Sequence, residues 1–180
     1  YGLEMPSNVI LQGMGDGTVL SIVAGGVFGV GCGISPKGMR TATANFGASS
    51  NVVLRDFKIV ASTQDDSSGN LLNIVHASYW YIYRLNIAGS IHHGIELDQS
   101  KYIVVKECRF TGSYSSPTSG SWIQFDYGSA GPCNRPVTIT TRSVEDILIE
   151  NCIFSERTGD TSNREIDMTH NASELVLERI

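Results

Sequence analysis

Residues 93–110, HGIELDQSKYIVVKECRF, contain two short segments in which apolar and polar residues alternate. The first segment is residues 95–98, the second begins at Ile103, and the polar pair Gln99 and Ser100 separates them. Alternation with a period of two predicts strands that bury one face. We therefore predict a strand, a tight corner and a second strand in this stretch.

The second strand of this unit recurs along the chain. Its copies are separated by 43, 29, 22, 44 and 28 residues, and they begin at Val9, Val52, Tyr81, Ile103, Ile147 and Leu175. Repeated units that cannot bury a face alone predict a solenoid. The shortest separation fits a coil of three short strands with their corners. The separations of 43 and 44 residues indicate either one coil with a large loop or two coils with an unrecognised middle strand, for which residues 138–140 are a candidate.

The remaining length of the repeats has the composition of loops. Segments rich in glycine, serine, threonine and aspartate occupy residues 62–69, 111–120 and 155–162. Such residues favour turns and surface loops. Each segment follows a second strand and precedes the next first strand, so we expect all three on one side of the solenoid.

Composition limits the classes of function. The chain has 180 residues, 19 glycines and a formal net charge of −5. A negative chain without a cluster of cations argues against a nucleic-acid partner. The apolar stretch 19–30 is broken by glycines and is too short to span a bilayer, so we expect no membrane insertion.

The domain organisation follows from the repeats. We predict that residues 1–180 form a single all-β segment of about six coils. The last copy begins at Leu175 and stops at residue 180, and a solenoid needs capped ends. We therefore expect this segment to belong to a longer protein.

Two of the four cysteines fall at the same place in successive visible repeats. Cys108 and Cys152 each follow a second strand by the same interval. The favoured interpretation is an interior column of small apolar side chains, and a disulfide between coils is the alternative. The cysteine spacing fits no zinc motif, and we predict no metal site.

Residues 5–20, MPSNVILQGMGDGTVL, resemble a segment of pectate-lyase-like right-handed parallel β-helices, which has the pattern V-x-L-x-G-x-G-x-G-T-x-L. The resemblance implies a right-handed parallel β-helix, a polysaccharide partner and an extracellular or virion-associated location. It also implies a homotrimer where the relatives are phage tail spikes. The chain lacks the polygalacturonase residue set, apart from a two-residue match at His93–Gly94. It also lacks the epimerase-type Asp-Pro-His.

Stacking the first strands by their apolar residues predicts an outward surface. The inward columns are Leu72, Ile95, Ile123, Ile166 and Ile74, Leu97, Phe125, Met168. A slip of one residue would bury the polar set, so this pattern fixes the register. The outward columns are then Asn73, Glu96, Gln124, Asp167 and Val75, Asp98, Asp126, Thr169, with His76, Gln99, Tyr127 and His170 at the corner.

This surface concentrates carboxylates. The candidate catalytic residues are Glu96, Asp98, Asp126 and Asp167. Carboxyl groups on adjacent strands would lie about 5 Å apart, near the separation in retaining glycosidases, and groups two strands apart would lie about 9–10 Å apart, near the inverting range. Neighbouring carboxylates also push their pKa values apart, so that one can hold a proton while the other is ionised.

Further residues are candidates for substrate binding. They are Asn73, His93, Gln124, Tyr127, Arg164 and His170, and Tyr127, Trp80 and Trp122 could stack on sugar rings. For each residue alone the alternative is an ordinary polar residue of a solvent-facing strand. Like charges on neighbouring strands are destabilising, however, and this cost favours a functional role for the cluster of carboxylates.

Three functions remain open from the sequence. The first is a hydrolase that cleaves polysaccharides without a cofactor, with Glu96 as general acid, Asp98 or Asp126 as nucleophile or base, and Asp167 assisting. The second is a lyase or epimerase acting on uronic acids, which needs Ca²⁺ on the acidic surface or an arginine such as Arg164. The third is a non-catalytic stalk that binds a glycan or is purely structural.

Overall fold

The computed structural model describes residues 2–22, 32–39, 41–42, 46–61, 70–89, 93–112, 121–126, 142–155, 164–168 and 175–178. These residues form strands and turns, and they include no helix. The described part therefore has no helix that is long and apolar enough to cross a membrane. The predicted all-β class is confirmed for this part of the chain.

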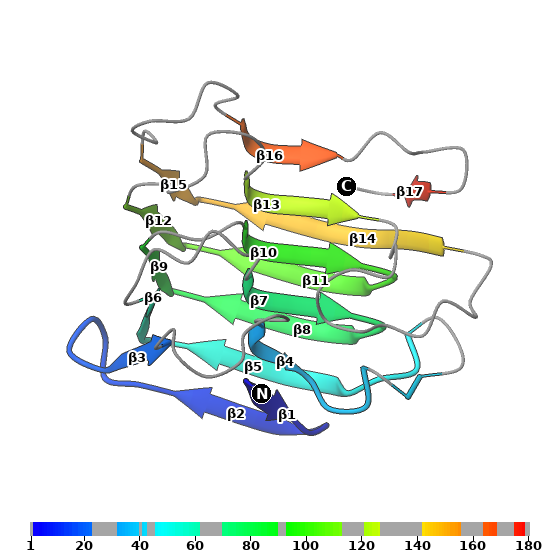
Figure 1. Ribbon diagram of the computed structural model, residues 1–180, viewed down its shortest axis with the longest axis horizontal. Helices are drawn as coiled ribbons and strands as arrows, with labels where there is room; N and C mark the ends of the chain where they lie inside the picture. The colour runs from blue at the N-terminus through cyan, green and yellow to red at the C-terminus, as the bar shows by residue number, and fades with distance from the viewer. Residues whose placement is uncertain are drawn as a thin grey trace.

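The strands form three parallel sheets, and the chain visits the sheets in rotation (Figure 1). The first sheet contains, in order, β1 (Leu3–Met5), β4 (Cys32–Pro36), β7 (Asn70–Val75), β10 (His93–Asp98), β13 (Ser121–Asp126) and β16 (Arg164–Met168). The second contains β2 (Val9–Gln12), β5 (Ser50–Arg55), β8 (Ser78–Tyr83), β11 (Lys101–Lys106), β14 (Arg142–Glu150) and β17 (Leu175–Glu178). The third contains β3 (Val19–Ile22), β6 (Lys58–Ala61), β9 (Asn86–Ala88), β12 (Arg109–Thr111) and β15 (Ile153–Phe154). This arrangement is that of a solenoid with three strands in each coil.

The register of the first sheet is the predicted one. Ile95 pairs with Leu72 and Ile123, and Ile123 pairs with Ile166. The first three of these side chains are buried in the core between the sheets, whereas Ile166 on the outermost strand β16 is 40% exposed. Stacked apolar columns of this kind hold successive coils together because each coil covers the face of the next.

In the second sheet, one of the predicted strand copies begins at a different residue. The copy expected to begin at Tyr81 begins one residue earlier, since Trp80 pairs with both Val52 and Ile103. Trp80 is buried, and its indole Nε1 donates a hydrogen bond of 3.1 Å to the carbonyl of Ser49. The final copy is also displaced, because Leu175 pairs with Arg142 and not with Ile147.

The separations of 43 and 44 residues each correspond to a single coil. Val9 pairs directly with Val52, and Ile103 pairs directly with Ile147, so no coil lies between the members of either pair. Residues 138–140, the candidate middle strand, lie outside the described residues. Most of the predicted loop segments 62–69, 111–120 and 155–162 also lie outside them.

The second sheet repeats one backbone conformation directly before its inward column. A residue with φ between 54° and 62° recurs there in successive coils, at Asn8, Asn51, Tyr79, Tyr102 and Asp146. Asparagine and aspartate tolerate this left-handed conformation, whereas a bulky side chain is an outlier in it. The Tyr79 and Tyr102 rings stack with centroids 4.6 Å apart, and this contact offsets part of the cost.

The cysteines confirm the interior column. Cys108 is buried in the core, Cys152 packs against it, and both thiols are free. A hydrogen bond between the two thiols and the burial of Cys108 raise the pKa of Cys108. The same thiol–thiol hydrogen bond lowers the pKa of Cys152 to about 7.

Candidate functional site

The first sheet brings the predicted polar columns together. Glu96 pairs with Asn73 on one side and Gln124 on the other, and Gln124 pairs with Asp167. In the neighbouring column, Asp98 lies between Val75 and Asp126. The predicted adjacency of these residues is therefore confirmed at the level of the backbone.

The outer face of the first sheet is not the open surface that we expected. The exposed fractions are 0% for Asn73, 3% for Glu96 and 0% for Asp98. All six residues of β7 and all six of β10 are buried, so both faces of these strands are removed from solvent. Parallel sheets are commonly covered on both faces, and this one follows that rule with a polar outer face.

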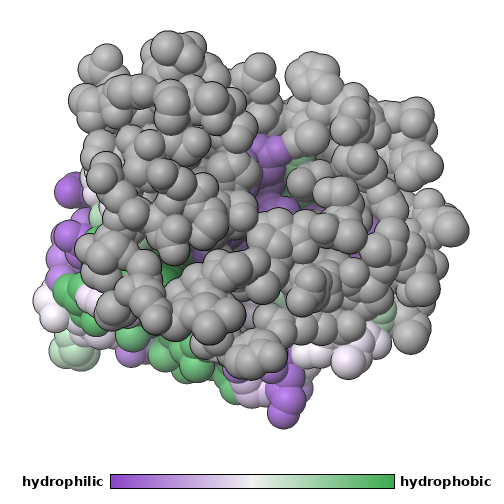
Figure 2. Space-filling view, in the orientation of Figure 1, coloured by the Kyte–Doolittle hydropathy of each residue, from purple (hydrophilic) through white to green (hydrophobic). Residues whose placement is uncertain are grey.

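A small part of this polar face reaches solvent. Figure 2 shows hydrophilic residues in the middle of the view, at the height where Figure 1 places β10 and β13. His93 and Gln124, which lie on those strands, retain 7% and 6% of their surface. Glu96 pairs with Gln124 and lies on the same strand as His93, so its small exposed surface belongs to the same region.

A set of hydrogen bonds fixes these side chains. The Asn70 amide donates a hydrogen bond to the Glu96 carboxylate. The Ser121 backbone N–H donates to His93 Nδ1 at 3.2 Å, so the proton of a neutral His93 ring lies on Nε2. The Ser121 hydroxyl donates a hydrogen bond of 2.9 Å to Gln124 Oε1, and its oxygen lies 3.0 Å from His93 Nδ1.

Two members of this network were not predicted from the sequence. Asn70 and Ser121 pair with His93 in the sheet, and Arg164 pairs with Ser121 on the far side. Asn70, His93, Ser121 and Arg164 thus form a third polar column. Strict alternation would place these residues on the inward side, because each lies two residues before an inward apolar residue. The alternation breaks at the start of the strands, where Leu71 and Trp122 enter the core together with Leu72 and Ile123.

One acceptor in the network has no partner. The Asn70 Oδ1 atom is buried and accepts no hydrogen bond within the described part of the chain. A buried polar atom without a partner costs about 1–3 kcal/mol. This unpartnered oxygen belongs to the same amide group that donates to the Glu96 carboxylate.

The structure places the other candidates less completely. The structure describes only the backbone positions of Asp126 on β13 and of Arg164 and Asp167 on β16. Tyr127 and His170 lie outside the described residues. Among the residues whose positions are given, no group of three or more histidine, cysteine, aspartate or glutamate side chains could hold a metal ion.

The expected stacking role of two tryptophans is wrong. Trp80 and Trp122 are buried, and Trp122 packs against Phe110 with ring centroids 5.7 Å apart. The Trp122 indole Nε1 donates a hydrogen bond of 3.3 Å to the carbonyl of Ser155. Both rings therefore belong to the core. Their burial is tolerated because the N–H group of each indole donates a hydrogen bond to a backbone carbonyl.

The arrangement is suited to proton transfer in an enclosed site. Glu96 is a carboxyl group held in place by an amide, and His93 and Gln124 lie on the same strand pair with fixed orientations. Fixed polar groups in a site of low dielectric constant act more strongly than they would in water.

Comparison with protein-family models, with curated proteins and with solved structures finds no match for this chain.

Proposed function

We propose that this chain is a polysaccharide-binding and polysaccharide-cleaving domain with the right-handed parallel β-helix of the pectate-lyase-like superfamily. Its substrate would be a bacterial surface or wall glycan, and its location would be extracellular or on a virion. The observation that carries this proposal is the polar column Asn73, Glu96, Gln124 and Asp167, which stands beside Asp98 and Asp126 in a stacked parallel sheet.

In the proposed reaction Glu96 is the general acid that protonates the leaving oxygen of the glycosidic bond. The hydrogen bond from Asn70 orients its carboxyl group. Asp98 follows Glu96 by two residues on β10, and it pairs with Asp126 on β13. Either aspartate is the candidate for the second carboxyl group, which acts as nucleophile or base.

The burial of the site limits which part of a polymer it can accept. His93, Glu96 and Gln124 each retain less than a tenth of their surface. An open groove along the solenoid would expose such residues over several sugar rings. Nearly enclosed side chains are suited to a chain end or a short side branch, so we expect products released from ends or branches.

The decisive experiment uses the complete protein that contains this chain, with purified bacterial capsular and wall polysaccharides as substrates. Glu96→Gln keeps the shape of the side chain and removes its acid function, so release of reducing ends is expected to fall by at least about a hundredfold. Glu150→Gln, on the outer face of the second sheet, is the matched control and is expected to leave the rate unchanged. Equal cleavage by wild type and Glu96→Gln would refute the assignment.

A second function is favoured by a different observation. Glu96, His93, Ser121 and Gln124 are nearly enclosed and are hydrogen-bonded to neighbouring polar residues, which is also what a structural polar ladder requires. Under this alternative the chain is a non-catalytic stalk or receptor-binding segment that assembles as a homotrimer. It predicts that no polymer is shortened, whether or not a glycan binds, and that analytical ultracentrifugation gives a trimeric mass.

A further inference from the structure

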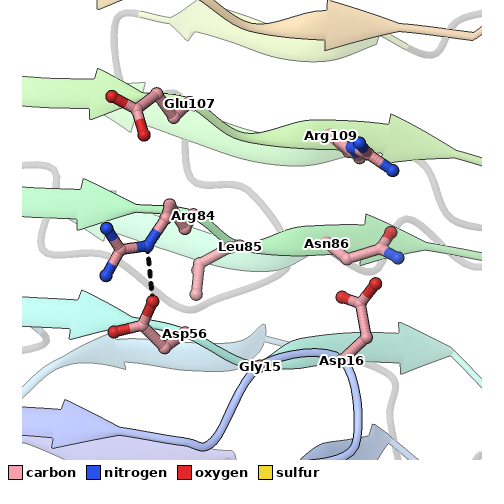
Figure 3. A pocket seen from close by; sticks show the side chains of 8 residues that line it. All are labelled: Gly15, Asp16, Asp56, Arg84, Leu85, Asn86, Glu107 and Arg109. Atoms are coloured by element: carbon pink, nitrogen blue, oxygen red, sulfur yellow. Dashed lines mark hydrogen bonds and ion pairs between the residues drawn. The ribbon is translucent and has the colours of Figure 1, made fainter.

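A separate hollow of about 390 Å³ lies at the corner between the second and third sheets. Figure 3 shows its polar lining, which comes from four successive coils. The polar lining residues are Asp16, Asp56, Arg84, Asn86, Glu107 and Arg109. None of them belongs to the polar columns of the first sheet, so the hollow is independent of the proposed function.

Three of these charged groups already have hydrogen-bond partners within the protein. Arg84 Nε lies 2.6 Å from Asp56 Oδ1, and the hydrogen bond from Arg84 lowers the pKa of Asp56. The Arg84 guanidinium also lies over the Tyr83 ring, 4.0 Å from its centroid. Glu107 accepts a hydrogen bond from the Tyr83 hydroxyl, which raises the pKa of Tyr83.

The two remaining charges have no partner. Asp16 and Arg109 are exposed, and their side chains make no hydrogen bond or ion pair within the described residues. Asn86 stands between them in Figure 3, one coil below Arg109, with which it pairs. Its Oδ1 accepts a hydrogen bond of 3.0 Å from Thr111, which leaves its amide N–H groups to the hollow.

We propose that this hollow binds a small zwitterion, the chemistry of an amino acid, with its ammonium group against Asp16 and its carboxylate against Arg109. The two side chains are too far apart to neutralise each other, since no ion pair joins them. A ligand that carries one charge of each sign satisfies both at once, whereas a singly charged ligand satisfies one. Exposed ion pairs are individually weak, so the dissociation constant is expected to be no tighter than about 30 mM.

The test is an NMR titration of the protein with a series of ω-amino acids from glycine to 6-aminohexanoate. Saturable shifts of the Asp16, Asn86 and Arg109 backbone amides are expected, with the tightest binding at one chain length that matches the spacing of the two charges. Butylamine and butyrate, which carry one charge each, should bind at least about threefold more weakly than the best zwitterion. Equal binding of the singly charged compounds, or no saturable shift at these amides, would overturn the proposal.

Four variants check that the charges themselves bind the ligand. Asp16→Asn and Arg109→Gln should each weaken binding of the best ω-amino acid to the level of the singly charged compounds. Arg55→Gln removes the same charge from a position outside the hollow and should bind like wild type. A double variant that exchanges the charges, Asp16→Lys with Arg109→Glu, should restore the preference for the zwitterion, and its failure to do so while it remains folded would count against the proposed contacts.

Discussion

The outer faces of the first and second sheets differ, although the two sheets are built in the same way. Both are parallel, both have six strands, and both turn an apolar column inward. In the first sheet, every residue of β7 and β10 is buried. In the second sheet, burial alternates along β8 and β11, and the outward residues are partly or fully exposed.

The difference shows that an outward position is not the same as a solvent-facing one. Tyr81, Val104 and Lys106 on the second sheet meet water, whereas Asn73, Glu96 and Asp98 on the first sheet do not. Hydrogen bonds and packing on a face without water are worth more than the same contacts on an open face. Matched substitutions on the two sheets therefore measure the contrast directly.

The largest difference is expected for the glutamates. Glu96→Ala leaves the buried Asn70 amide without its acceptor and should lower the free energy of unfolding by about 1–3 kcal/mol. Glu150→Ala removes an ion pair to Lys106 of 3.0 Å at the surface and should cost about 0–1 kcal/mol. Denaturant titration of both variants measures the two values, and equal costs would show that the two faces are equivalent.

A smaller difference is expected for two valines. Val75 on the first sheet is buried and packs with Met39, so Val75→Ala should lower the free energy of unfolding by about 1–2 kcal/mol. Val104 on the second sheet is half-buried, and Val104→Ala should cost less than about 0.5 kcal/mol. Thermal unfolding of both variants under one condition makes the comparison. A cost at position 104 as large as at position 75 would contradict it.

The smallest effect concerns the exposed corner beside the second sheet. The Asp56 pKa lies below its ordinary value of 3.8 because Arg84 donates a hydrogen bond to it. A depressed carboxyl pKa contributes stability that is full above the unfolded-state value and is lost as the pH falls through the folded-state pKa. Arg84→Gln should move the Asp56 pKa back up toward 3.8 and remove this acid-dependent contribution.

Carboxyl NMR titration of Asp56 between about pH 2 and 6 measures that change. Arg55→Gln is the control, because Arg55 Nε lies at a longer distance, 3.8 Å, from Asp56. It should shift the midpoint less than Arg84→Gln does. The reverse order would mean that charge alone, and not the short hydrogen bond, sets the Asp56 pKa.

The inward columns could be predicted from the sequence because several copies of one alternation agree with each other. Position 81 shows where this reasoning fails. The residues Trp80, Tyr81, Ile82 and Tyr83 are all large and partly apolar, so the sequence does not say which pair faces inward. The pairing of Trp80 with Val52 and Ile103 decides it.

Other features have no local signal. The strands of the third sheet are two to four residues long, which is too short for a period to appear. The left-handed backbone conformation at Tyr79 and Tyr102 lacks the glycine that would mark it in the sequence. The enclosure of Glu96 also escapes prediction, because alternation shows which residues leave water and not what lies beyond the polar ones.

The direct pairing of Trp80 with Ile103 has a consequence for the size of the molecule. These residues lie 23 positions apart and occupy equivalent places in adjacent coils. Residues 80–102 therefore contain one full circuit of backbone, with one segment for every sheet. A tandem duplication of this circuit would lengthen the stack by a single rise of about 4.8 Å, so the length of the solenoid can change only in whole steps.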